Sequence, residues 1–214
     1  PPQQEGTQPL YMTGFPLFDG SIPGTPLDDE LQRFLDQGSR PLVFTQGSTE
    51  HLQGDFYAMA LRALERLGAR GIFLTGAGQE PLRGLPNHVL QRAYAPLGAL
   101  LPSCAGLVHP GGIGAMSLAL AAGVPQVLLP CAHDQFDNAE RLVRLGCGMR
   151  LGVPLREQEL RGALWRLLED PAMAAACRRF MELSQPHSIA CGKAAQVVER
   201  CHREGDARWL KAAS

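Results

Sequence analysis

Residues 106–117 form the stretch Gly-Leu-Val-His-Pro-Gly-Gly-Ile-Gly-Ala-Met-Ser, in which three glycines stand between two apolar segments. Its first four residues are typical of a short buried strand, and the residues from Ile113 onward are typical of a helix. A strand, a glycine-rich turn and a helix in this order direct backbone N–H groups and the positive end of the helix at an anion. Glycines also let a diphosphate approach the backbone closely. A tight turn without a ligand is the simpler alternative.

The same stretch lies within residues 93–133, which contain no Asp, Glu, Lys or Arg. A long uncharged run raises the question of a membrane span, but five prolines divide it into pieces that are too short. Short apolar pieces joined by glycine-rich turns are typical of buried parallel strands. Because strand-like and helix-like segments alternate along the chain, we expect an α/β domain with a Rossmann-like parallel sheet and helices on both faces.

The expected boundaries follow from apolar periodicity and from the Gly and Pro positions. A lead-in helix is expected to open at residues 27–31. Strands are expected at 41–46, 71–75, 89–93, 106–109, 127–129 and 147–151, and helices at 54–67, 114–122, 135–145, 156–169, 171–184 and 188–204. Residues 1–40 are interpreted as an interdomain linker with its helix, residues 41–205 as a nucleotide-binding domain and residues 206–214 as a C-terminal tail.

The composition excludes several classes of function. Lys and Arg number 20 against 21 Asp and Glu, and no basic cluster stands out, so a nucleic-acid partner is not expected. The six cysteines lack C-x-x-C spacing and the six histidines are dispersed, so neither a disulfide framework nor a metal site is predicted. Scattered reduced thiols are typical of a cytoplasmic protein.

Two further strand ends carry polar side chains. Gly47 and Ser48 follow the first expected strand, where a hydroxyl can contact a phosphate or simply cap the next helix. Asp134 and Gln135 follow the fifth, and a carboxylate beside an amide can bind vicinal sugar hydroxyls. Helix capping by Asp134 is the alternative. His133 is not expected to form a catalytic dyad with Asp134, since adjacent side chains rarely face each other.

A nicotinamide dinucleotide is a weaker alternative ligand. Gly112 and Gly114 match the first two glycines of the G-x-G-x-x-G fingerprint, but Ser117 stands where the third glycine belongs. Asp134 lies 20 residues after Gly114, at about the distance expected of a ribose-binding acid. A non-catalytic nucleotide-binding module is also compatible with these residues.

Together the strand ends resemble the donor-binding C-terminal half of the two-domain (GT-B) glycosyltransferases of the UDP-glycosyltransferase-like family. The resemblance covers about residues 41–205. It is most specific in the His-Pro-Gly-Gly-x-Gly turn, in Ala-Ala-Gly-Val-Pro-Gln at 121–126 and in Asp-Gln-x-x-Asn-Ala at 134–139. Within the family, residues 131–151 and 207–211 look most similar to the catalytic rhamnosyltransferase subunits of bacterial rhamnolipid synthesis.

The resemblance implies a role for each matching position. The donor diphosphate would be contacted by Gly47, Ser48, His109, Gly111, Gly112, Ile113, Gly114 and Ala115. The base would be held by Tyr94, Ala95 and Leu97, with Tyr94 at the stacking position and Ala95 offering backbone hydrogen bonds. The sugar would be held by Asp134 and Gln135.

Two positions depart from the family pattern. Pro110 stands where the family usually has a phosphate-contacting His, so either the turn and helix dipole suffice or His109 reaches the phosphates. Leu118 stands where a Glu often holds the ribose hydroxyls, which suits a deoxythymidine donor.

The resemblance also implies the reaction and its partners. The donor would be dTDP-L-rhamnose, with no metal or further cofactor, and transfer would invert the anomeric centre. The acceptor would be a lipid-like 3-(3-hydroxyalkanoyloxy)alkanoic acid, bound by an N-terminal half outside these residues. That half would supply the general base, so no catalytic residue is expected here and the isolated chain would be inactive. Such an acceptor fits peripheral membrane association of the full enzyme. The alternative acceptors are macrolides or sterol-like molecules.

Overall fold

The structure is a computed structural model that describes residues 11–18, 25–46, 56–77, 80, 82–152, 154–184 and 187–204. These residues form two compact units, which are described separately. The larger unit spans Phe18–Ser184 and contains the sheet. The smaller unit combines the residues up to Leu17 with those from Gln185 onward.

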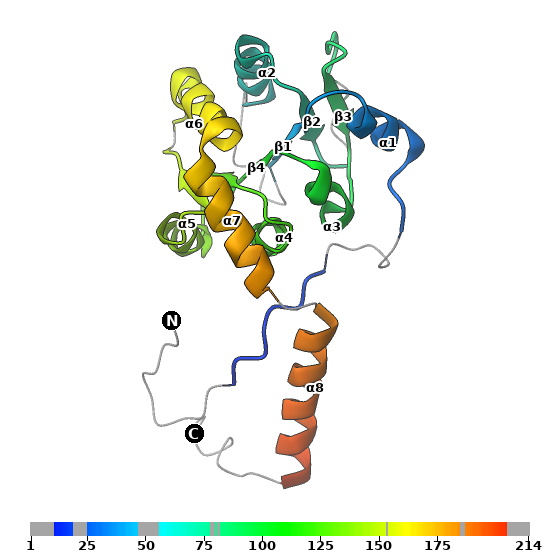
Figure 1. Ribbon diagram of the computed structural model, residues 1–214, viewed down its shortest axis with the longest axis vertical. Coiled ribbons are helices and arrows are strands. Elements are labelled where there is room, and N and C mark those ends of the chain that lie inside the picture. The colour runs from blue at the N-terminus through cyan, green and yellow to red at the C-terminus, as the bar shows by residue number, and fades with distance from the viewer. Residues whose placement is uncertain are drawn as a thin grey trace. The chain divides into compact units, whose positions relative to one another are not determined.

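The larger unit is built on a six-stranded sheet in which every pair of neighbouring strands is parallel. The strands are β1 (Leu42–Thr45), β2 (Gly71–Leu74), β3 (Val89–Arg92), β4 (Gly106–His109), β5 (Gln126–Leu128) and β6 (Gly148–Arg150). Their spatial order is β3-β2-β1-β4-β5-β6, so the direction of winding reverses between β1 and β4 (Figure 1). This order confirms the Rossmann-like sheet that the sequence predicts.

Helices cover the sheet on both faces. They are α1 (Asp29–Asp36), α2 (Phe56–Leu67), α3 (Leu97–Leu100), the 3₁₀ turn η1 (Leu101–Ser103), α4 (Ile113–Ala121), α5 (Gln135–Arg144), α6 (Glu157–Glu169) and α7 (Pro171–Leu183). α2 packs against α6, whereas α3 and α5 both contact α4. Figure 1 shows these two groups on opposite sides of the strands. The central strands are therefore shielded from water on both faces.

The core explains why these segments adopt their structures. In α2 the buried residues recur every three to four positions, as an amphipathic helix requires: Phe56, Ala60, Ala63 and Leu64. On β1 and β2, Phe44 and Phe73 are fully buried, and their rings meet edge to face with centroids 5.3 Å apart.

The expected strands are confirmed to within two residues at each end, and so are the expected helices wherever they fall in the described residues. The lead-in helix expected at 27–31 is α1, which Asp28 caps by accepting hydrogen bonds from the N–H groups of Glu30 and Leu31. α3 and η1 were not predicted. Gly47 and Ser48, as well as residues 207–211, lie outside the described residues.

The larger compact unit spans Phe18–Ser184, whereas the nucleotide-binding domain predicted from the sequence spans residues 41–205. α1 belongs to the sheet unit because it buries Leu31 and Phe34, and the Arg70 guanidinium lies 4.1 Å from the centre of the Phe34 ring. The predicted limits of the nucleotide-binding domain, at residues 41 and 205, stay a prediction.

The smaller unit contains α8 (His187–Glu204) and residues 11–17, which form neither a helix nor a strand. The Arg200 guanidinium lies 4.8 Å from the centre of the Tyr11 ring. Within the described part of the chain, no helix combines the length and apolar character needed to cross a membrane.

Candidate functional site

The candidate site lies at the carboxyl edge of the sheet, where all six parallel strands end on the same side. In open α/β sheets ligands bind at this edge, next to the point where the winding reverses. The loop with Tyr94 follows β3, the glycine turn follows β4 and Asp134 follows β5. Contacts of α4 with both α3 and α5 bring these segments together. The residues directly after β1, including Gly47 and Ser48, are outside the described part.

The glycine turn presents an open helix end. Gly111 has φ +100°, and an added Cβ would lie 3.0 Å from Leu128 Cδ2, so only glycine fits without strain. Gly112 is the N-cap of α4, and no side chain caps it. An added Cβ on Gly112 or Gly114 would meet nothing within 4 Å. Since the first N–H groups of a helix have no partner inside it, this end of α4 is arranged to bind an anion.

His109 lies beneath this turn and is fully buried. Its Nδ1 accepts a hydrogen bond from the Gly111 N–H over 3.2 Å, which places the ring proton on Nε2. Nε2 then donates to Gln126 Oε1 over 2.9 Å, and Gln126 Nε2 donates to the Met116 carbonyl. Burial lowers the pKa of His109 to about 4, although the hydrogen bond to Gln126 opposes this effect. The imidazole is therefore neutral at pH 7.

The interpretation that His109 reaches the phosphates in place of Pro110 is not the arrangement seen. Both ring nitrogens are occupied inside the protein, and no ring atom is exposed. His109 instead supports the turn from below. Contacts between the diphosphate and residues 111–115 stay a prediction.

Asn138 holds the other side of the turn. Its Nδ2 donates to the Gly111 carbonyl over 3.0 Å and to Asp134 Oδ2 over 2.8 Å. Asp134 is the N-cap residue of α5, but its side chain makes no capping hydrogen bond. The capping alternative is therefore wrong, and the exposed Asp134 carboxylate is fixed by Asn138 beside the glycine turn.

Gln135 is mostly turned inward. Its Oε1 accepts hydrogen bonds from the backbone N–H groups of Cys131 and Ala132, and the side chain is buried. These bonds close the loop that precedes α5. Of the predicted pair, Asp134 can accept from a sugar hydroxyl, whereas Gln135 has only its Nε2 left to donate. Contact between either residue and a sugar stays a prediction.

The predicted base loop follows β3. Tyr94 is 59% exposed, Ala95 is buried, and Leu97 is half-buried at the start of α3. Three strand spacings separate β3 from β4, which is roughly 14 Å. A ligand that touches both loops must be extended, as a nucleotide is. Base contacts of these residues stay a prediction.

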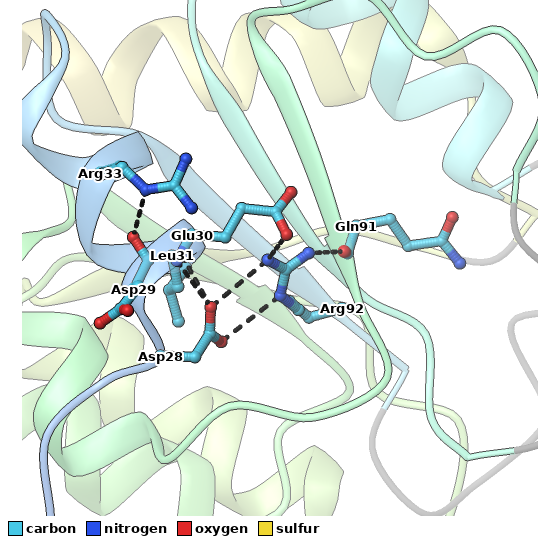
Figure 2. Close-up of polar contacts among 7 residues, drawn as sticks. All are labelled: Asp28, Asp29, Glu30, Leu31, Arg33, Gln91 and Arg92. Atoms are coloured by element: carbon cyan, nitrogen blue, oxygen red, sulfur yellow. Dashed lines mark hydrogen bonds and ion pairs between the residues drawn. The ribbon is translucent and has the colours of Figure 1, made fainter.

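An ion-pair cluster anchors the end of β3 just before this loop (Figure 2). Arg92 lies between two carboxylates, with Nη2 2.7 Å from Glu30 Oε2 and 3.4 Å from Asp28 Oδ1. The Leu31 N–H donates to the Asp28 carboxylate, and together with Arg92 it lowers the Asp28 pKa. The cluster ties α1 to the strand that leads into the base loop.

The comparisons with known proteins identify the family. Residues 60–202, more than half of the chain, match the family described as "Erythromycin biosynthesis protein CIII-like, C-terminal domain". The chain belongs to this glycosyltransferase family. Its α/β domain has the fold of the C-terminal half of a GT-B glycosyltransferase.

Two curated relatives illustrate the similarity. An O-mycaminosyltylonolide 6-deoxyallosyltransferase from Streptomyces fradiae is 37% identical over 177 residues, which cover 80% of this chain and 40% of the relative. A 3-alpha-mycarosylerythronolide B desosaminyl transferase from Saccharopolyspora erythraea is 39% identical over 110 residues, which cover 50% of this chain and 26% of the relative. The matched region is thus less than half of each relative.

Solved structures agree with this placement. Glycosyltransferase VinC in complex with dTDP superposes with a TM-score of 0.71 at 31% identity, covering 92% of this chain and 49% of VinC. The spinosyn forosaminyltransferase SpnP gives a TM-score of 0.67 at 28% identity, covering 86% of this chain and 49% of SpnP. The comparisons support the prediction that this chain is the C-terminal half of a GT-B glycosyltransferase. They show no link to the enzymes of rhamnolipid synthesis.

Proposed function

We propose that this chain is the half of an inverting glycosyltransferase that binds a dTDP-linked deoxysugar, for transfer to a macrolide or related polyketide. The observation that carries the proposal is the uncapped end of α4 behind Gly111 and Gly112, with the Asp134 carboxylate held beside it. A diphosphate at the helix end would place an attached sugar toward Asp134. The deoxysugar transferases among the relatives support this donor class.

The backbone is suited to the leaving group of the reaction. The acceptor oxygen forms a bond to the anomeric carbon while the bond from that carbon to the diphosphate oxygen breaks, and the diphosphate keeps the electron pair. The N–H groups and dipole of α4 stabilise the charge that develops there. Residues 93–133, which include the glycine turn and the start of α4, contain no Lys or Arg, so within this stretch the stabilisation would come from the backbone. The acceptor proton goes to a general base in the other half of the enzyme.

The nucleotide preference rests on two supports. Leu118 lies buried in α4, where an acid that holds the ribose hydroxyls often stands in the wider family. The similar structure of VinC contains dTDP. We therefore expect dTDP to compete against a bound dTDP-sugar better than UDP does.

The macrolide or polyketide acceptor replaces the rhamnolipid precursor as the main assignment, because the aglycones in the relatives' names are of the macrolide type. The narrower assignment is transfer of L-rhamnose to a 3-(3-hydroxyalkanoyloxy)alkanoic acid in the cytoplasm. Among the described residues, only the similarity of residues 131–151 to rhamnosyltransferase subunits of rhamnolipid synthesis supports it.

A turnover assay on the full-length protein separates these acceptors. Each of dTDP-L-rhamnose and a dTDP-aminodeoxysugar would be offered with a macrolide aglycone or with the hydroxyalkanoyloxy acid. We expect product with the macrolide only, and donor binding without turnover for the isolated 214-residue chain. Transfer to the lipid acid would establish the rhamnolipid assignment instead, and turnover by the isolated chain would contradict the proposed division of roles.

A further inference from the structure

Asn138 connects two parts of the candidate site that are far apart in the chain. It is 6% exposed on α5, and its two amide hydrogens serve two different acceptors. One acceptor is the Gly111 carbonyl, in the turn after β4. The other is Asp134 Oδ2, four residues earlier on the same helix face. One buried side chain therefore contacts both the glycine turn and the carboxylate predicted to contact the sugar.

The Gly111 peptide unit depends on this contact. Its N–H is held by His109 Nδ1 and its carbonyl by Asn138 Nδ2, so both polar groups of the residue are bound by side chains. Gly111 has φ +100°, and a Cβ added to it would lie 3.0 Å from Leu128 Cδ2 and 3.3 Å from the Gln135 carbonyl oxygen. The orientation of Gly111 sets the direction of the backbone N–H groups that follow it at the start of α4. Loss of the Asn138 bond would free one side of the turn.

Asp134 depends on the same amide. An exposed carboxylate normally samples several rotamers, and ordering it costs conformational entropy. Asn138 holds Oδ2, while Oδ1 has no hydrogen-bond partner among the described residues. The carboxylate is thus oriented before any ligand arrives, with one oxygen left to accept from a sugar hydroxyl. Preorganisation of this kind increases affinity by reducing what must be ordered on binding.

We propose that Asn138 is a positioning residue that holds the glycine turn and the Asp134 carboxylate as one unit. The donor diphosphate and the donor sugar would then bind to groups whose relative position is fixed. This inference rests on the proposed function and adds a residue that the sequence did not single out for a role. Asn138 does not itself contact the donor. It acts through Gly111 and Asp134.

The test compares Asn138→Ala with Leu142→Ala. Leu142 is buried on the same helix and makes no hydrogen bond to the turn, so its truncation controls for a general loss of stability. Three quantities are measured for each protein, at a temperature that lies the same number of degrees below that protein's own melting temperature. They are amide hydrogen exchange of Gly111 and Gly112, the side-chain coupling constants of Asp134, and the affinity for dTDP by calorimetry.

We expect Asn138→Ala to speed amide exchange in the turn at least tenfold, to average the Asp134 rotamers and to weaken dTDP binding at least fivefold. Leu142→Ala should change none of these. Equal effects of the two substitutions would overturn the inference. If the unmodified protein does not bind dTDP, the proposed function fails, while the exchange and coupling measurements, made without ligand, still decide whether Asn138 holds the turn and the carboxylate.

Discussion

His109 donates from Nε2 to Gln126 Oε1 over 2.9 Å, and both side chains are fully buried. This pair joins neighbouring strands beneath the glycine turn, and Gln126 continues the chain of hydrogen bonds to the Met116 carbonyl in α4. Each donor and acceptor along the path has a partner only when the imidazole is neutral and protonated on Nε2. The relationship therefore makes the turn sensitive to the protonation of one histidine.

The first prediction concerns pH. Because burial lowers the pKa of His109 to about 4, the unfolded chain takes up a proton between about pH 6.5 and 4 that the folded chain does not. Stability from this group is present above pH 6.5 and is lost as the pH falls. From pH 7 to pH 5 we expect a loss of about 2 kcal/mol in the free energy of unfolding. Urea denaturation at each pH measures it.

The control for this pH effect is His109→Asn, which keeps an acceptor near the Gly111 N–H but does not titrate. Other groups titrate in both proteins, so the quantity of interest is the difference between the two curves. That difference should shrink by about 2 kcal/mol between pH 7 and pH 5. A difference that stays constant with pH would mean that His109 is not held neutral.

The second prediction separates backbone strain from ligand approach at the turn. Gly114→Ala should leave stability unchanged or raise it by up to about 1 kcal/mol, because the added Cβ meets nothing and alanine favours a helix. It should nevertheless weaken dTDP binding about tenfold, since the methyl group stands where the diphosphate approaches. Thermal unfolding and calorimetry give the two values.

Gly111→Ala is the matched comparison for that substitution. At φ +100°, with Leu128 Cδ2 3.0 Å from the new Cβ, it should lower both stability, by about 1–3 kcal/mol, and dTDP affinity. Wild-type affinity in Gly114→Ala would show that no diphosphate sits at the start of α4.

Much of this fold can be predicted from the sequence, because the apolar periods and glycines that define a parallel sheet are local. α3 and η1 were missed since four-residue and three-residue helices carry too little periodic signal. The inward orientation of His109 was missed because a histidine beside glycines is typical of a ligand contact. The sequence signal that could have indicated it is the position of His109 at the end of the predicted buried strand 106–109, which the structure confirms as β4 with all four residues buried.

The tie between Asn138 and Asp134 was also within reach of the sequence, since residues four apart on a helix can pair. The bond from Asn138 to Gly111 was not, because it joins two segments that meet only when β4 and β5 are neighbours. Side-chain partners across the sheet depend on the three-dimensional arrangement rather than on any local pattern.

The third prediction concerns the cluster around Arg92. Asp28→Asn keeps an oxygen that can cap α1 but removes the charge that faces Arg92, whereas Asp28→Ala removes both. Because the Asp28 carboxylate is more than half exposed, its ion pair with Arg92 contributes at most about 1 kcal/mol. Asp28→Ala should be less stable than Asp28→Asn by about 1 kcal/mol, measured by urea denaturation. Equal stabilities would show that the cap contributes nothing.

We expect a nucleoside diphosphate to bind across the carboxyl edge of the sheet with its phosphates at the start of α4. The most direct measurement is a titration of the chain with dTDP, followed by calorimetry and by the backbone amide signals. We expect saturable binding, weaker competition by UDP than by dTDP, and the largest shifts at Gly111, Gly112, Ile113, Gly114 and Ala115. Absence of binding, preference for NAD, or shifts confined to residues away from the glycine turn would contradict it.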